Sequence, residues 1–358
     1  MENSDIMAER SFQSGVDGRA LSLLERFGHD AVCWQILSPS VRRWFSRRYN
    51  GLVGYIVRGD YLISAGAPVA PPEDIPAVAA EFREFAVRQG RTACFLCAQQ
   101  GNLTDQCTGF SSLCIGAQPL WDPRHWVRRL ASRPGLRSQI RRAAAKGIRA
   151  ELVSVQSEDM LAALEHCLNA WLAGRWYGMT FLAQPRILEQ RLPGRLAVAA
   201  GLPGSREVLA FLAASPVPAR RGYYIELIAR RKQVPNGTTE VLIDRLMRHL
   251  AEQDAAYATL GLVALSRLCP VEWWKNPRWF RWGGAAALRF GQSLYHFSGL
   301  ERFRMRLNPE AWEPVYAISA QTQFSPLAAV AIVQSLFGVP NRMAGLSVRK
   351  GSWGGFAD

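Results

Sequence analysis

The chain has 358 residues, of which 49% are hydrophobic, so it can bury one large core or two of ordinary size. This composition excludes a disordered chain and a fibrous repeat. Lys and Arg number 43 against 29 Asp and Glu, which gives a formal net charge of +14. Such a balance is expected of a protein that meets polyanions, and both nucleic acid and an anionic lipid surface qualify.

The cellular compartment is predicted from three features that the sequence lacks: a membrane-spanning run, a signal peptide and a disulfide framework. No apolar run reaches the roughly 18 to 20 residues that a membrane-spanning helix needs, and the start, MENSDIMAERSFQSG, lacks the basic-then-apolar pattern of a signal peptide. The seven cysteines are irregularly spaced and do not form a disulfide framework. We therefore expect a cytoplasmic protein with reduced cysteines.

No metal site is predicted. Cys94 and Cys97 lie inside an apolar strand pattern rather than in the turn of a zinc knuckle, and the five histidines are scattered along the chain.

The first half of the chain predicts a helix, a strand pair, a second helix and a strand. A helix begins near residue 20, and residues 51–69 form two short strands with a turn between them. From Asp74, apolar residues recur at helical spacing, among them Val78 and Phe82, as far as Gly90. Residues 91–100 then predict a buried strand.

The second half repeats this order. Residues 157–174 predict a helix, and strands follow at 195–202, 207–217 and 222–230. Residues 238–253 predict a strongly amphipathic helix, and residues 258–265 predict a further strand. The recurrence suggests a tandem duplication of one α/β unit.

A basic segment joins the two units. Its helix-forming part carries Arg137, Arg141, Arg142 and Lys146, and no Asp or Glu occurs between Arg124 and Arg149. A charged helix face is often simply solvated. Here the positive charge is uncompensated, which suits phosphate contacts.

Two apolar segments leave alternatives open. The tryptophans between Trp273 and Trp282 alternate with Lys and Arg, so they either pack against a core edge or contact bases or lipid headgroups. The tail from Phe324 to Val339 is too short to span a membrane comfortably. It either packs on the core, which we favour, or docks on a membrane surface.

The most informative segment runs from the strand at 222–230 into the following helix. The strand ends with Glu226 and Arg230, Asn236 and Gly237 form a turn, and we expect Thr238 to be the N-cap with Glu240 in the first helical turn. Such a turn is either a plain helix cap or an anion and oxyanion site, because the free N–H groups of a helix start favour negative charge.

Nucleotide fingerprints are missing. Neither GxxxxGK[ST] nor GxGxxG after a strand occurs. Any group transfer must therefore use a substrate that arrives already activated, and no cofactor is predicted.

The order of segments resembles the catalytic domain of the bacterial phosphatidylglycerol lysyltransferases, also called multiple peptide resistance factors. The resemblance extends from about Leu21 to Ile318. It is carried in order by LLERFGHDAVCWQILSP, SAGAPVAPPED, VRQG, LRSQIRRAAAKGI, ELIARRKQVPNGTTEVLIDRLM, ATLGLVALS and LERFRMRLNPEAWEPVY.

The resemblance implies a mixed α/β (α+β) fold with tandem GNAT-like acyltransferase domains. We expect an N-terminal GNAT-like domain at 20–125, a basic linker helix at 126–150, a C-terminal catalytic domain at 151–320 and an apolar tail at 321–358.

The resemblance also implies the reaction, in which an aminoacyl group moves from aminoacyl-tRNA to a hydroxyl of phosphatidylglycerol. Under it, Glu226 is the candidate base or orienting acid, Arg230 and the helix start at Thr238 are anion stabilisers, and Glu240 binds the aminoacyl amine. Arg304 stands where the family has a lysine. The further substrate-binding candidates are Asn236, Gly237, Arg302 and Arg306, and the candidates for tRNA phosphates are the four cations of the linker.

The implied partners are aminoacyl-tRNA and an anionic phospholipid, met at the inner face of the cell membrane. Full-length members of the family carry a multi-span membrane region, which this sequence lacks, so we expect a separate flippase. Two alternatives stay open: an acyl-coenzyme-A-dependent N-acyltransferase, and a non-catalytic module that binds tRNA or a membrane surface.

Overall fold

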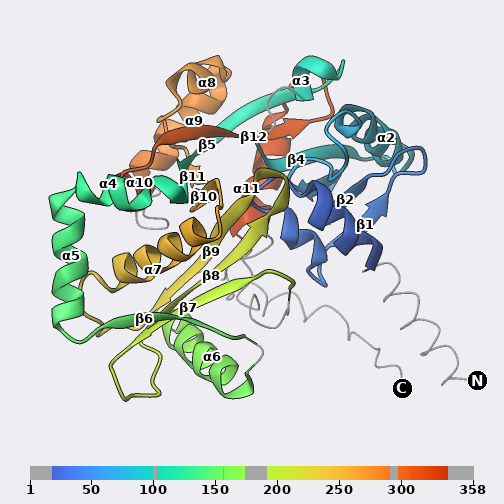
Figure 1. Ribbon diagram of the computed structural model, residues 1–358. Coiled ribbons are helices and arrows are strands. Elements are labelled where there is room, and N and C mark those ends of the chain that lie inside the picture. The colour runs from blue at the N-terminus through green and yellow to red at the C-terminus, as the bar shows by residue number, and fades with distance from the viewer. Residues whose placement is uncertain (1–17, 100–102, 156, 174–191, 291–296, 338–358) are drawn as a thin grey trace, which may run out of the picture.

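A computed structural model of the chain describes residues 18–99, 103–155, 157–173, 192–290 and 297–337 (Figure 1). The N-terminal half, residues 18–121, begins with a helix over residues 18–27, as the sequence predicts, and continues with one short 3-10 helix, two further helices and five strands. They are η1 (Cys33–Leu37), β1 (Arg42–Phe45), β2 (Leu52–Arg58), β3 (Tyr61–Ala65), α2 (Ile75–Arg88), β4 (Thr92–Ala98), α3 (Leu103–Gln106) and β5 (Ser111–Trp121).

The connection to the C-terminal half is helical. It consists of η2 (Pro123–His125), α4 (Trp126–Ala131) and α5 (Pro134–Ala145).

The C-terminal half, from residue 149 onward, supplies the remaining elements. They are β6 (Arg149–Val153), α6 (Glu158–Leu172), β7 (Leu196–Gly201), β8 (Ala210–Val217), η4 (Pro218–Arg220), β9 (Gly222–Arg230), α7 (Thr238–Glu252), β10 (Tyr257–Thr259), β11 (Val263–Ala264), α8 (Pro270–Lys275), α9 (Arg278–Phe290), α10 (Phe297–Arg306), β12 (Ala311–Ser319) and α11 (Pro326–Phe337).

All strands belong to one continuous sheet. Its order is β1-β2-β3-β4-β12-β5-β10-β9-β8-β7-β6, with β11 paired to β5. In each half, antiparallel strands lead to a strand, a helix and a parallel strand: β3-α2-β4 in the first and β9-α7-β10 in the second. The expected fold class, a mixed α/β fold made of two similar units, is confirmed.

The two halves share strands at their junction. β12 comes from the end of the chain but lies antiparallel between β4 and β5, and β5 in turn pairs with β10. Each half therefore completes the other's sheet. The domain boundaries that we expect at residues 125, 150 and 320 remain predictions.

Helices cover both faces of the sheet (Figure 1). In the N-terminal half, Val78 and Phe82 of α2 pack on one face, and Trp34 of η1 lies in the core on the other. In the C-terminal half, α7 packs on one face through Leu242 and Leu246, and α6 packs on the opposite face through Leu164.

The helix α11 tests the two interpretations of the apolar tail. Its residues Ala328 and Ile332 are buried in the N-terminal core, so the prediction that the tail packs on the core is confirmed for this face. The opposite face exposes Leu327, Val330 and Val333. Residues 338–358 lie outside the described residues. Within the described ranges, every helix is too short or too polar to cross a bilayer.

Candidate active site

Glu226 lies at a β-bulge in the middle of β9. In the register between β8 and β9, Ala213 pairs with Leu227 and Ala214 pairs with Ile225, so Glu226 is the extra residue. Bulges bend a strand and redirect a side chain, and they are common beside active sites. Glu226 therefore occupies a place where the fold has departed from regular pairing.

The carboxylate of Glu226 is held by two buried partners. The Nε of Arg195 lies 2.9 Å from its Oε1, and the Ser215 hydroxyl donates to the same oxygen at 2.7 Å. The side chains of Glu226 and Arg195 are each only 2% exposed. Among the described residues, Oε2 has no hydrogen-bond partner.

The protonation of this pair reflects its burial. Burial raises the pKa of Glu226, and the Arg195 guanidinium and the Ser215 hydroxyl offset part of the rise. Burial also lowers the pKa of Arg195, although Glu226 opposes that change. A raised pKa makes a carboxylate a stronger base than an exposed one, which is compatible with a role in proton transfer.

Arg230 does not join this cluster. It is exposed at the end of β9, and four residues of strand place it about 13 Å along the chain from Glu226. The arginine beside Glu226 is Arg195, which the sequence analysis did not single out. A role for Arg230 as an anion stabiliser remains a prediction.

The start of α7 differs from the expectation. Its N-cap is Gly237 rather than Thr238, which is the first helical residue and is fully buried, with its hydroxyl donating to the Pro235 carbonyl oxygen at 2.7 Å. The expected N-cap was therefore wrong by one residue. The reason is local: Gly237 has φ +97°, a conformation that glycine adopts without strain.

The helix α5 covers this helix start. A Cβ on Gly237 would lie 2.3 Å from the carbonyl oxygen of Gln139 and 3.2 Å from Ala143, both in α5. Of the other two predicted residues here, Asn236 is exposed and Glu240 is buried. The turn is thus a packing contact between two helices, and its anion-binding role remains a prediction.

The three arginines of α10 divide into one inward and two outward residues. Arg304 donates to the Gly261 carbonyl oxygen at 2.6 Å, just after β10. Gly261 lies against the ring of Tyr224 in β9. Arg302 and Arg306 are exposed on α10. The structure therefore places Arg304 just after β10, beside the Gly261 backbone that lies against Tyr224 of β9.

A partly buried polar network joins the two halves. Glu313 of β12 accepts hydrogen bonds from Arg220 at 2.7 Å and from Gln118 at 2.8 Å. Gln118 also donates to the Tyr257 hydroxyl at 3.2 Å. Burial raises the pKa of the Cys33 thiol, and the nearby charges of Asp30 and Glu226 raise it further.

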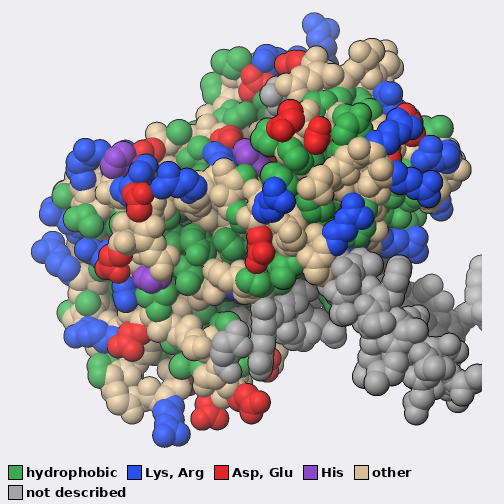
Figure 2. Space-filling model, turned by 45° about the vertical axis from the view of Figure 1, so that its right-hand side comes forward, with side chains coloured by type: hydrophobic (Ala, Val, Ile, Leu, Met, Phe, Trp, Pro, Cys, Tyr) green, Lys and Arg blue, Asp and Glu red, His purple; other side chains and the backbone are tan. Residues whose placement is uncertain are grey.

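The basic face expected on the linker is present on α5. Arg137, Arg141, Arg142 and Lys146 are all exposed, and none has a carboxylate partner among the described residues. Figure 2 shows Lys and Arg side chains gathered at two ends of one face, over the linker helices and over the N-terminal half. Both gatherings are long-range sources of positive potential.

Comparison with known proteins now adds to this geometry. The family model described as "Phosphatidylglycerol lysyltransferase, C-terminal" matches residues 21–319. The chain belongs to this family. Its resemblance to the lysyltransferases, expected from the sequence, is confirmed.

Solved structures share the fold of this lysyltransferase-family chain. The C-terminal domain of a lysylphosphatidylglycerol synthetase from Agrobacterium fabrum has a TM-score of 0.72 at 22% identity, covering 91% of this chain and 98% of its own. L-PGS from Bacillus licheniformis has a TM-score of 0.72 at 21% identity, covering 90% and 97%. FemX has a TM-score of 0.54 at 10% identity, covering 81% and 90%. No curated protein matches the chain.

Membership of the lysyltransferase family supports an enzyme, and specifically a transferase. Sequence reasoning found Glu226 and Arg304 but missed Arg195, Ser215 and Glu313 as parts of the junction. Glu313 stands within the WEPVY segment that carried the resemblance, so that motif was a usable signal. Arg195 had no comparable signal, because only the pairing of β7 with β8 brings it beside Ser215.

Proposed function

We propose that this chain transfers an aminoacyl group from aminoacyl-tRNA to a hydroxyl of phosphatidylglycerol or a related polar lipid. The observation that carries the proposal is the family match over residues 21–319. The chemistry agrees with the composition, because an aminoacyl ester is already activated and both substrates are polyanions that a chain of charge +14 attracts.

The reaction needs a base and an oxyanion stabiliser. The lipid hydroxyl attacks the ester carbonyl and gives its proton to the base; the carbonyl–oxygen bond to the tRNA ribose then breaks, and the ribose oxygen takes that proton and leaves as a hydroxyl. In this proposal Glu226 Oε2 takes the proton while Arg195 and Ser215 hold Oε1, and the lack of a hydrogen-bond partner for Oε2 among the described residues supports this role. Arg304 supplies a permanent positive charge, since an arginine does not act as a proton-transfer base.

The donor side of the proposal rests on α5. Its uncompensated cations suit tRNA phosphates, and the packing of Gln139 on Gly237 supports this reading against acyl-coenzyme A. A pyrophosphate bound at a helix start needs its N–H groups open, whereas α5 covers the start of α7.

The acceptor side rests on two exposed apolar surfaces. Trp274 is 62% exposed and Trp282 is 78% exposed on α8 and α9, whereas Trp273 is buried. Together with the outer face of α11, these residues support peripheral contact with an anionic membrane, because tryptophan and arginine suit the headgroup layer. In this proposal a separate flippase moves the product across the membrane.

The direct test is transfer with purified protein. A mixture of tRNAs charged with radiolabelled amino acids is incubated with phosphatidylglycerol vesicles, and lipid-linked label is identified by chromatography and mass spectrometry. The expected product is aminoacylated lipid, formed with charged tRNA but not with free amino acid, ATP and uncharged tRNA. Failure to transfer from any charged tRNA refutes the proposed function, and salt-dependent tRNA binding without turnover would identify a binding module instead.

A further inference from the structure

A second concentration of positive charge lies at the outer edge of the N-terminal half. Residues 31–59 contain five arginines and no Asp or Glu, and four of the five fall in the segment RRWFSRRY at 42–49. This segment forms the edge strand β1 and the loop after it, beside α2. Seven strand spacings, about 33 Å, separate β1 from β9 and the site around Glu226.

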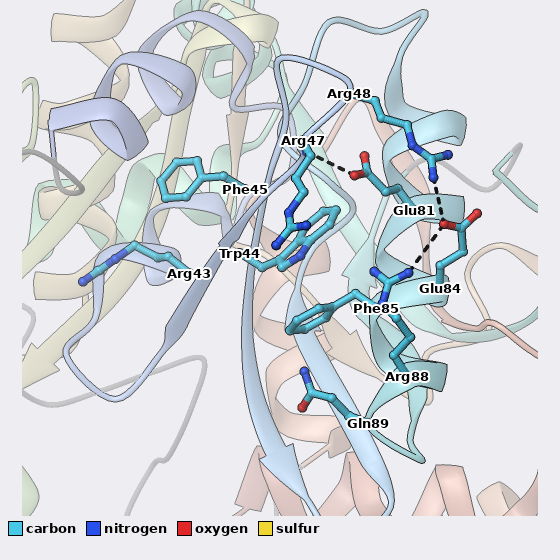
Figure 3. A pocket seen from close by; sticks show the side chains of 10 residues that line it. All are labelled: Arg43, Trp44, Phe45, Arg47, Arg48, Glu81, Glu84, Phe85, Arg88 and Gln89. Atoms are coloured by element: carbon cyan, nitrogen blue, oxygen red, sulfur yellow. Dashed lines mark hydrogen bonds and ion pairs between the residues drawn. The ribbon is translucent and has the colours of Figure 1, made fainter.

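A cavity of about 790 Å³ opens between this segment and α2 (Figure 3). Four arginines line it, together with the aromatic rings of Trp44 and Phe85. The arginines are Arg43, Arg47, Arg48 and Arg88. The cavity is large enough for a small ligand, and its lining combines cations with flat apolar faces.

The arginine-bearing loop is fixed by a buried clamp. The Ser46 hydroxyl donates to Glu81 at 2.5 Å and accepts from the backbone amides of Arg48 at 3.2 Å and Tyr49 at 2.8 Å. The backbone amide of Arg47 donates to Glu81 at 3.1 Å. Glu81 therefore accepts hydrogen bonds from Ser46 and from the loop backbone, and the guanidinium groups of the loop arginines lie outside this cluster.

The other carboxylate at the cavity, Glu84, neutralises the charge of the arginines only weakly. Glu84 lies 3.3 Å from Arg48 and 3.9 Å from Arg88, and all three side chains are largely exposed. Ion pairs this exposed contribute little and exchange readily for a better anion. Arg47 has no carboxylate partner among the described residues. A phosphate arriving here would meet two or three guanidinium groups at once.

The aromatic side chains that line the cavity are also held in place by packing. The ring of Trp44 lies 5.3 Å from that of Phe82 and 5.7 Å from that of Phe85, so its orientation is set by packing from behind. Trp44 and Phe85 are half-buried and line the cavity. Such rings are the usual stacking surface for an unpaired base.

The surroundings favour a nucleic acid over a membrane. In residues 18–99 the exposed large apolar side chains are Tyr49 and Val87, whereas α8, α9 and α11 together expose seven. A membrane surface would be expected to engage the second group. We propose that the cavity beside β1 binds an unpaired nucleotide of an RNA strand, with the base stacked on Trp44 and the backbone phosphates held by Arg47, Arg48 and Arg88.

This site is separate from the proposed transfer site, and it rests on the proposed function only in that the donor tRNA would supply the RNA. The experiment measures binding without turnover. A fluorescein-labelled 12-nucleotide single-stranded RNA and an uncharged tRNA are titrated with the full chain, and anisotropy is recorded over a series of salt concentrations.

Three variants give the expected pattern. Trp44→Ala weakens single-strand binding about tenfold or more, and Trp44→Phe restores most of it. Arg47→Glu weakens binding and lowers the slope of log K against log salt by about one. Arg58→Glu is the matched control, because Arg58 is an exposed arginine of the same half outside the cavity, and it changes affinity less than twofold.

The opposite results are equally clear. Unchanged affinity in both Trp44→Ala and Arg47→Glu overturns the proposal, as does an equal loss in Arg58→Glu. If adenosine monophosphate competes as strongly as the RNA, the ligand is not a strand and the assignment is overturned. If Trp44→Ala and Arg47→Glu lose binding to phosphatidylglycerol vesicles but keep their binding to RNA, the cavity belongs to lipid and the proposal is overturned. If wild type transfers no aminoacyl group yet shows the expected binding pattern, the proposed function fails and the RNA site stands.

Discussion

Replacing Glu226 by Gln removes one charge from a buried ion pair. The partner charge on Arg195 is 2.9 Å away, and both side chains are 2% exposed, so water cannot take the place of the lost carboxylate. Breaking such a pair from one side typically destabilises a protein by about 3 to 5 kcal/mol. Since whole domains are stable by only about 5 to 15 kcal/mol, we expect Glu226→Gln to lose a large share of its stability.

A double variant separates this structural effect from catalysis. Removing both charges, as in Glu226→Gln with Arg195→Met, leaves no uncompensated ion, so we expect it to be more stable than the sum of the single variants by at least about 1 kcal/mol. The measurement is urea unfolding followed by tryptophan fluorescence for the four members of the cycle. Additive losses, or a loss below about 1 kcal/mol in Glu226→Gln, would refute the reasoning about the pair.

Activity in the same variants then decides the role of Glu226. If its Oε2 takes the acceptor proton, the double variant stays inactive in the transfer assay even at temperatures where it is fully folded. If Glu226 only holds the junction together, activity returns along with stability. The comparison uses one protein preparation for both measurements, so a folding defect cannot be mistaken for a chemical one.

Four further predictions test separate parts of the structure. Gly237→Ala should lower stability by about 2 kcal/mol or more in thermal unfolding, because it adds a backbone clash to a positive φ; Gly204→Ala, also at positive φ but in open space, should lose only about 1 to 2 kcal/mol. Burial alone would raise the pKa of Glu81, but hydrogen bonds from Ser46 and the following backbone amides outweigh burial and lower that pKa. The stabilisation by the Glu81 carboxylate is therefore present above the ordinary carboxyl pKa and is lost as the pH falls through the lowered value. The difference in melting temperature between wild type and Glu81→Gln should accordingly close in acid. Arg141→Glu should weaken tRNA binding and reduce its salt slope by about one in filter-binding titrations. Trp282→Ser should reduce sedimentation with phosphatidylglycerol vesicles and leave the melting temperature unchanged, since this side chain is 78% exposed.

Local patterns in the sequence were sufficient for the individual elements. The helix expected from Asp74 to Gly90 occurs as α2 over Ile75–Arg88, and the amphipathic helix expected at 238–253 occurs as α7 over Thr238–Glu252. Both are long segments with apolar residues at helical spacing, which is the strongest signal a single sequence offers. The insertion of β12 between β4 and β5 had no such signal, because it depends on pairing across about 200 residues of chain.

The site was predictable only where chemistry and local order coincide. Glu226 was singled out because it stands near the end of the strand at 222–230, in a segment that carries the family resemblance. Its partner could not be found by spacing, since Arg230 lies on the same strand and points to a different place, whereas Arg195 precedes β7 and approaches through the pairing of three strands. At Gly237 the sequence motif suggested an anion site, but the backbone of Gln139 in the neighbouring helix α5 packs against this turn.

Under the proposed function, the insertion of β12 into the N-terminal half would let one protein engage two unlike anionic substrates. Because β12 ties the end of the chain into the N-terminal half, Glu313 reaches both Gln118 of that half and Arg220 of the other, and the junction is fixed from both sides. A fixed junction allows different surfaces to specialise. The helix α5 carries exposed cations and none of the large exposed apolar side chains, while α9 and α11 carry exposed tryptophan, leucine and valine. In the proposed reaction a nucleic acid and a lipid headgroup would select different surfaces of such a molecule, and only their reactive ends would need to meet, at Glu226.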